Sequence, residues 1–156
     1  MKSDREQKII ASNRRARHDF NVVSTYEAGI VLTGTEVKSL RTGRCSLQDA
    51  HCKFLDKNSL ELYVYNLHIN TYSHGNIQNH KEKRPRKLLL NYRELKKIKN
   101  MVLEKGVVLI PLTIYFSGHL VKIELALCTS KRKYDKREAQ KEREVKRELD
   151  RKFKSR

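Results

Sequence analysis

Apolar and polar residues alternate with period two in several short runs of the chain, and this alternation is typical of half-buried β-strands. The first run begins at Phe20, and a second run extends over residues 30–40. Gly34 interrupts the second run, where a missing side chain predicts a bulge in the strand or a close approach of another backbone. The alternation would then place Glu36 and Lys38 on the same face of that strand.

Further apolar runs predict two hairpins, separated by a polar loop over residues 71–86. A helix is predicted over residues 92–105, because Asn91 suits an N-cap and Glu94 stands at the third helical position of a capping box. Gly106 suits the end of this helix. The runs that pair in the two hairpins are 51–55 with 60–69 and 107–116 with 120–127.

The order of these elements predicts a mainly β fold. There are roughly six short strands, one internal helix and no regular alternation of strand with helix, which favours a small closed, OB-like barrel. We expect three parts: a flexible N-terminus over residues 1–12, an OB-like barrel over 13–128 and a basic C-terminal tail over 129–156.

The tail has its own pattern. Residues 129–156 contain 13 Lys or Arg against 6 Asp or Glu, and few apolar side chains. Val145, Leu149 and Phe153 recur at every fourth position and would form one stripe on a helix. Because so little carbon can be buried, we expect the tail to be disordered in isolation and helical when bound.

The charge favours a polyanionic partner. The chain of 156 residues carries a formal net charge of +17, and subtracting the tail's seven charges leaves +10 on the remainder. A positive charge spread over both parts attracts RNA, DNA or an anionic surface. No segment approaches the run of about 20 apolar residues that a membrane span needs, so we expect no membrane partner.

Cysteine usage and the N-terminus predict a cytoplasmic protein without a metal or other cofactor. Cys45, Cys52 and Cys128 match neither paired CxxC motifs nor a disulfide scaffold, and the first seven residues do not resemble a secretory signal. His74 and His80 do not combine with the cysteines at the spacing of a zinc site.

Several motifs together resemble the SsrA-binding protein (small protein B) family, and the resemblance covers about residues 10–150. The segment Gly34-Thr-Glu-Val-Lys-Ser39 and the segment Asp135-Lys-Arg137 make the resemblance specific. The other motifs are Asn13-Arg-Arg-Ala-Arg-His-Asp19, Asn66-Leu-His-Ile69 with Tyr72, Arg86-Lys-Leu-Leu-Leu-Asn91 and Tyr134 before Asp135. Ser130, Lys133, the segment 81–86 and the tail after Asp150 depart from the family's usual pattern.

The resemblance implies an OB-like barrel that binds the tRNA-like domain of tmRNA (transfer-messenger RNA), aids its aminoacylation and acts in bacterial trans-translation. It implies delivery of this RNA, with elongation factor Tu bound to the same RNA, to the empty A site of a stalled ribosome. It also implies that the tail enters the decoding centre and the vacant mRNA channel of the small subunit.

Basic and stacking side chains that can grip a folded RNA occur in several places. We expect the cluster at residues 14–18, the pair Glu36 and Lys38, and the segment Leu90-Asn91 to contact RNA. The expected RNA-binding residues are Arg14, Arg15, Arg17, His18, Glu36, Lys38, Arg41, Arg86, Lys87, Leu90, Asn91, Lys131, Arg132 and Lys133. The expected tail contacts in the decoding centre are Tyr134, Asp135, Lys136, Arg137, Lys141, Arg143, Lys146 and Arg147.

Two other functions remain open from the residues alone. A general ribosomal protein or RNA chaperone would show the same basic barrel and tail without preferring tmRNA. A metal-dependent nuclease would use Asp19 with the Glu36-Val-Lys38 string, where carboxylates hold Mg²⁺ and the lysine positions water. We expect a non-enzymatic protein, because such strings are common in basic chains.

Overall fold

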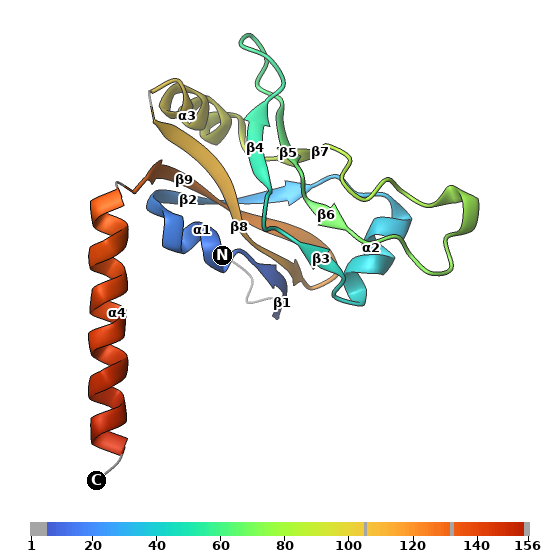
Figure 1. Ribbon diagram of the computed structural model, residues 1–156. Helices are drawn as coiled ribbons and strands as arrows, with labels where there is room; N and C mark the ends of the chain where they lie inside the picture. The colour runs from blue at the N-terminus through green and yellow to red at the C-terminus, as the bar shows by residue number, and fades with distance from the viewer. Residues whose placement is uncertain (1–5, 105, 132, 155–156) are drawn as a thin grey trace.

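A computed structural model describes residues 6–104, 106–131 and 133–154 of the chain. Its centre is a barrel of antiparallel strands, and one long helix extends away from it (Figure 1). The strands are β1 (Gln7–Ser12), β2 (Phe20–Ile30), β3 (Cys45–Ser46), β4 (His51–Phe54), β5 (Leu62–Tyr65), β6 (His68–Ile69), β7 (Arg86–Leu89), β8 (Val107–Ser117) and β9 (Leu120–Ser130). The helices are α1 (Arg14–Asp19), α2 (Gly34–Arg41), the short 3-10 helix η1 (Asn76–Gln78), α3 (Tyr92–Val102) and α4 (Lys133–Lys154).

The barrel closes because β8 and β9 pair with each other as well as with other strands. Within the described residues the order is β8-β4-β5-β7-β2-β9, and β9 returns to β8, which gives a ring of six strands. The long strand β8 pairs with β4 at Leu109 and with β1 over Thr113–Ser117. The expected closed barrel is confirmed, and both predicted hairpins are present.

Alternating side chains from all six strands fill the barrel. Leu62, Val64, Ile114 and Ile123 are fully enclosed. Each such side chain contributes about 1.5–3 kcal/mol through burial, so the barrel is a packed core and needs no bound ligand to hold it. Ile98 of α3 also packs against this core and places the helix over one end of the barrel.

The N-terminal part differs from the prediction of a flexible segment. Residues 7–12 form β1, which pairs with β8 from Gln7 opposite Ser117 to Ser12 opposite Thr113. Residues 1–5 lie outside the described part of the chain. The first two predicted runs are joined, because β2 continues without a break through residues 27–29 and β9 pairs along nearly its whole length.

The expectation of a bulged second strand is wrong: residues 34–41 form the helix α2. Thr33 and Glu36 make a capping box at its start, in which the Glu36 carboxylate accepts the backbone N–H of Thr33 at 2.9 Å. This arrangement satisfies N–H groups that the first helical turn leaves unpaired. Gly34 therefore opens a helix and does not interrupt a strand.

The internal helix agrees closely with the prediction. It begins after Asn91, whose N–H donates to Glu94 in a second capping box, and the backbone at Gly106 has a φ of 87°. That left-handed conformation favours glycine, which explains why the chain turns there.

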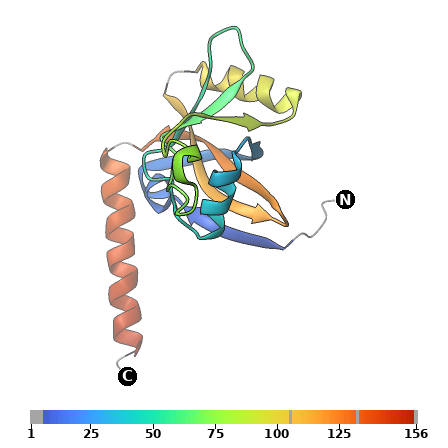
Figure 2. The ribbon, with the colours of Figure 1, turned by 90° about the vertical axis from the view of Figure 1, so that its right-hand side faces the viewer.

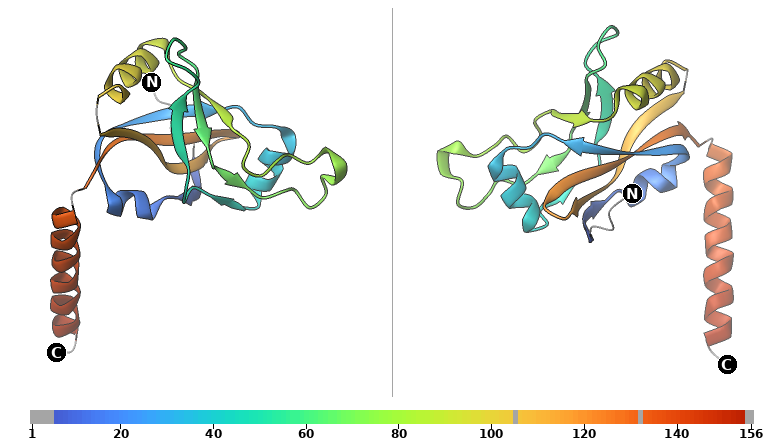
Figure 3. Two further views of the ribbon diagram at one scale, coloured as in Figure 1. Left: turned by 45° about the horizontal axis from the view of Figure 1, so that its top comes forward. Right: turned by 180° about the vertical axis from the view of Figure 1, so that it is seen from behind.

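The C-terminal tail forms the long helix α4, as its periodicity indicated. All views show it projecting away from the barrel (Figures 2 and 3). Val145, Leu149 and Phe153 are exposed by 50% or more of their surface. That the tail is disordered in the free protein stays a prediction. None of the described helices is long and apolar enough to cross a membrane.

Candidate nucleic-acid interface

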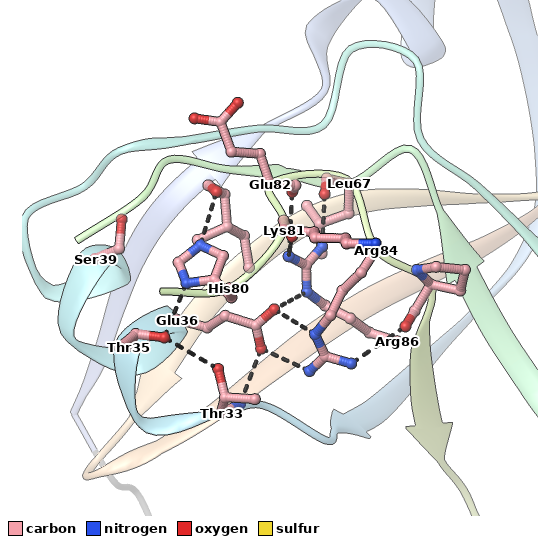
Figure 4. A network of polar contacts seen from close by, with 12 residues as sticks. Thr33, Thr35, Glu36, Ser39, Leu67, His80, Lys81, Glu82, Arg84 and Arg86 are labelled. Atoms are coloured by element: carbon pink, nitrogen blue, oxygen red, sulfur yellow. Dashed lines mark hydrogen bonds and ion pairs between the residues drawn. The ribbon is translucent and has the colours of Figure 1, made fainter. Parts of the chain in front are cut away.

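Glu36 of the predicted site is completely buried and bonded on both carboxylate oxygens. Its carboxylate accepts two hydrogen bonds of 2.8 Å from Arg84 and one of 2.7 Å from Arg86 (Figure 4). Both arginines lie about 50 residues further along the chain. The buried ion cluster of these three residues therefore joins α2 to the segment before β7.

Arg86 is also fully enclosed and bonds in several directions. Its guanidinium donates to the carbonyl oxygen of Leu67 at 2.6 Å and to that of Glu82 at 3.1 Å. Arg84 is the outer partner, with a side chain that is 30% exposed. The planar guanidinium of Arg86 has five donors, so it can pair with Glu36 and at the same time bond the carbonyl oxygens of Leu67 and Glu82.

Protonation of this cluster is fixed by its partners. Burial alone would raise the pKa of Glu36, but the hydrogen bonds from Arg84, the Thr33 backbone and Arg86 outweigh it and hold the pKa below its usual value. Burial lowers the pKa of Arg86, and Glu36 opposes that change. We conclude that the cluster is ionised at neutral pH.

These contacts correct two of the expected RNA contacts. Glu36 and Lys38 do not share a face, because α2 is a helix and residues two apart point in different directions. Glu36 and Arg86 are both enclosed, so neither presents its charge to a ligand. Their contribution to an interface is to hold the surface above them in place.

That surface is the loop of residues 70–85, which further polar contacts fix against α2. Ser39 donates its hydroxyl to the Asn70 carbonyl at 2.5 Å. His80 bridges Thr35 at 3.0 Å and the carbonyl of Ile69 at 2.9 Å (Figure 4). The loop is therefore held by polar bonds at several points along its length.

Lys38 remains an exposed cation, as expected of an RNA contact. It lies on α2 with its ammonium 5.6 Å from the centre of the Tyr72 ring. The aromatic face attracts the cation and restricts where it points. Arg41, at the end of the same helix, is also exposed.

The first predicted basic cluster is on α1, on the outer surface of the barrel. Its arginines are exposed and make only loose ion pairs, 3.5 Å from Arg15 to Asp19 and 3.7 Å from Arg17 to Glu124. His18 contacts Asp19 at 3.0 Å. Exposed pairs of this kind contribute little, so the arginines can exchange them for phosphates. The members of this cluster are Arg14, Arg15, Arg17 and His18.

The structure places the base of the tail beside this cluster. The N–H of Lys131 donates to the carbonyl oxygen of Asp19, the last residue of α1, at 3.3 Å. Arg132 lies outside the described residues, and only the backbone is described for Lys133, Tyr134, Asp135 and Lys136. The cationic surface of α1 therefore continues to the start of the tail, whereas α2 and its loop lie at another end of the barrel (Figure 1).

The remaining predicted contacts lie on β7 and at the start of α3. Lys87 is partly exposed and pairs with Glu61 at 2.8 Å, and this hydrogen bond raises the pKa of Lys87. Leu90 packs in part against the core, whereas Asn91 is exposed while its backbone takes part in the capping box of α3. Asn91 can thus cap the helix and still present its amide to a ligand.

Along α4 the basic side chains that the structure describes are exposed. Arg143, Arg147, Arg151 and Lys154 recur at spacings that place them on one face, opposite the apolar stripe at Val145, Leu149 and Phe153. The other exposed basic residues of the expected set are Arg137, Lys141 and Lys146.

The proposed nuclease centre does not fit this geometry. The Glu36 carboxylate is engaged by two arginines and a backbone N–H, which leaves it unsuited to hold Mg²⁺. Burial raises the pKa of Cys45 to about 12, so this thiol is not a ready nucleophile. Over the residues that the structure describes, no group of three or more His, Cys, Asp or Glu is placed to hold a metal ion.

Comparison with known proteins agrees with the geometry. A family model described as SmpB protein matches residues 10–155. The SsrA-binding protein of Carboxydothermus hydrogenoformans is 47% identical over 150 residues, covering 96% of this chain and 99% of that protein. The SsrA-binding protein of Thermobifida fusca is 51% identical over 152 residues, covering 96% and 93%.

A solved structure, "tmRNA-SmpB: a journey to the center of the bacterial ribosome", contains a similar chain. It is 44% identical, with a TM-score of 0.65, and the match covers 83% of this chain and 92% of that one. The sequence similarity extends through barrel and tail alike, and the barrel found here is the one that the motifs predicted. The chain therefore belongs to the SmpB family.

Proposed function

We propose that this protein binds the tRNA-like domain of tmRNA and delivers it to stalled ribosomes in the bacterial cytoplasm. The observation that carries the proposal is the match to proteins named for SsrA binding, which spans nearly the whole length of both chains. The solved relative, whose name places tmRNA and SmpB together at the bacterial ribosome, supports the same assignment. Elongation factor Tu would take part through the shared RNA.

The distribution of charge supports a division of labour within the chain. The exposed arginines of α1, together with Lys131 at the tail base, form one cationic surface of the barrel. Lys38, Lys87 and Asn91 add polar contacts elsewhere on it. Lysine and arginine position phosphates, while amide and aromatic groups read or stack on bases. The barrel therefore has the chemistry to hold a folded RNA.

The tail has a different chemistry, which suits a narrow binding site with walls of RNA and protein. The 22-residue helix α4 spans about 33 Å at 1.5 Å per residue. One face carries Arg143, Arg147 and Arg151, and the opposite face carries the exposed apolar stripe. Such a helix gains contacts only when a partner surrounds it, as the mRNA channel of the small subunit would.

Two experiments test the proposal. The intact protein should bind the tRNA-like domain of tmRNA far more tightly than bulk tRNA in direct competition. Equal affinity would favour a general RNA chaperone. A chain ended after Tyr134 should keep this selectivity but lose the tagging of peptides on stalled ribosomes in a reconstituted translation system. Full tagging by the shortened chain would remove the role of the tail.

A further inference from the structure

A cavity of about 390 Å³ opens between the start of α2 and the loop of residues 72–78. Its volume lies within the range of about 300–1,000 Å³ that is usual for small-molecule sites. Two rings and one cation line it, together with hydroxyl and amide groups. The lining side chains that matter here are Thr35, Lys38, Tyr72, His74 and Gln78.

The loop side of this cavity has little apolar packing of its own and is held by polar bonds. Asn79 closes the loop, because its side-chain oxygen accepts the Tyr72 N–H at 3.0 Å and its amide donates to the Tyr72 carbonyl at 2.6 Å. The N–H of Gly75 donates to the same carbonyl at 2.9 Å. Ile77, at the tip, is completely exposed. Compact loops that are fixed at their base and exposed at their tip are typical binding elements.

The rings are arranged to leave aromatic surface available. Tyr72 and His74 meet edge to face, with centroids 5.4 Å apart and planes at 75°. His74 is exposed, and Lys38 stands over the Tyr72 ring. Stacking on an aromatic side chain beside a phosphate-binding cation is how proteins hold unpaired bases.

We propose that this cavity binds one unpaired nucleotide of an RNA loop. The base stacks on the exposed His74 ring beside Tyr72, and Gln78 donates or accepts a hydrogen bond at the base edge. The ammonium of Lys38 contacts the adjoining phosphate. The buried ion cluster beneath, formed by Glu36, Arg84 and Arg86, holds α2 and the loop at the separation that the base needs. This inference rests on the proposed function, because the RNA it concerns is the tRNA-like domain.

The test uses the full chain and a tRNA-like-domain RNA in which each loop nucleotide is replaced in turn by an abasic residue. His74→Ala and Tyr72→Leu should each weaken binding of the unmodified RNA about tenfold, as loss of one stacked base does. His119→Ala is the matched control, since His119 is likewise an exposed histidine and lies in the turn between β8 and β9. It should bind as the parent protein does.

One abasic position should weaken the parent protein about tenfold and have no further effect on the His74→Ala variant. His74 is exposed, so this substitution leaves the fold intact, and thermal unfolding checks that. The inference is overturned if both cavity variants bind as His119→Ala does, or if no abasic position behaves differently between parent and variant. Failure of the proposed function is a separate result, in which the parent protein itself shows no preference for the tRNA-like domain.

Discussion

Replacing Glu36 by glutamine tests whether the buried ion cluster holds the fold. The substitution keeps the size of the side chain but leaves the fully buried Arg86 and the partly buried Arg84 without a countercharge. Removing one partner of a buried ion pair costs about 3–5 kcal/mol. A domain of this size has a free energy of unfolding of about 5–15 kcal/mol, so the loss is a large fraction of the total.

The assay is urea unfolding at pH 7, with the midpoint and slope of the transition measured for each variant. The midpoint should fall while the slope stays constant, and the melting temperature should drop by about 10–20 °C at about 4 °C per kcal/mol. The control is Glu61→Gln, which removes an ion pair of the same length, 2.8 Å, whose side chains are 40% and 44% exposed. That change should cost less than about 1 kcal/mol.

A double-mutant cycle separates the ion cluster from the rest of the structure. Arg86→Met should cost less in the Glu36→Gln protein than in the parent, because its countercharge is already gone. The reasoning is refuted if Glu36→Gln loses no more stability than Glu61→Gln. It is also refuted if RNA affinity falls while stability is unchanged, since Glu36 would then contact the ligand directly.

Three further predictions concern the ionisation of Glu36, the arginines of α1 and the helix α4. The pKa of Glu36 is lower in the folded protein than the unfolded value of 4.5, so its contribution to stability is complete above that pH and is lost as the pH falls below it. The stability difference between parent and Glu36→Gln should therefore stay constant from about pH 7 to pH 5 and shrink below about pH 4.5. A constant difference down to pH 3 would contradict this. Changing Arg14 and Arg15 to glutamine should reduce the slope of log K against log salt by about 1.4–1.8, at about 0.7–0.9 per phosphate contact, and an unchanged slope would exclude α1 from the interface. Amide hydrogens after Lys133 should exchange rapidly in the free protein while those of β8 and β9 are protected. The reason is that α4 leaves its apolar residues exposed, and an isolated helix has only marginal stability in water. Protection of the tail equal to that of α3 would show that it is folded before binding.

The barrel and α3 could be predicted from the sequence because their signals are local. Alternating runs separated by turn residues give the hairpins, Asn91 and Glu94 mark the start of α3, and Gly106 follows shortly after its end at Val102. Each of these features lies within a few residues of the element that it defines. The periodicity of Val145, Leu149 and Phe153 indicated the tail helix in the same way.

The helix α2 and the burial of Glu36 could not be predicted with the same rules. The segment from Gly34 to Arg41 contains β-branched residues and a weak apolar pattern that fits strand or helix. The capping box formed by Thr33 and Glu36 is a sequence signal for the start of a helix. The alternation of apolar and polar residues over 30–40 obscured that signal. The partners of Glu36 lie 48 and 50 residues away, so its burial depends on a contact that no local pattern reveals.

The order of the strands also determines how the chain folds. Gln7 pairs with Ser117, and Phe20 pairs with Ser130, so each contact joins residues 110 positions apart. The first two strands therefore stay without these partners until β8 and β9 have been synthesised. Proteins dominated by such distant pairings fold slowly, in milliseconds to seconds. During that interval their unpaired edges are exposed to aggregation, so rapid access to a chaperone would raise the yield of folded barrel.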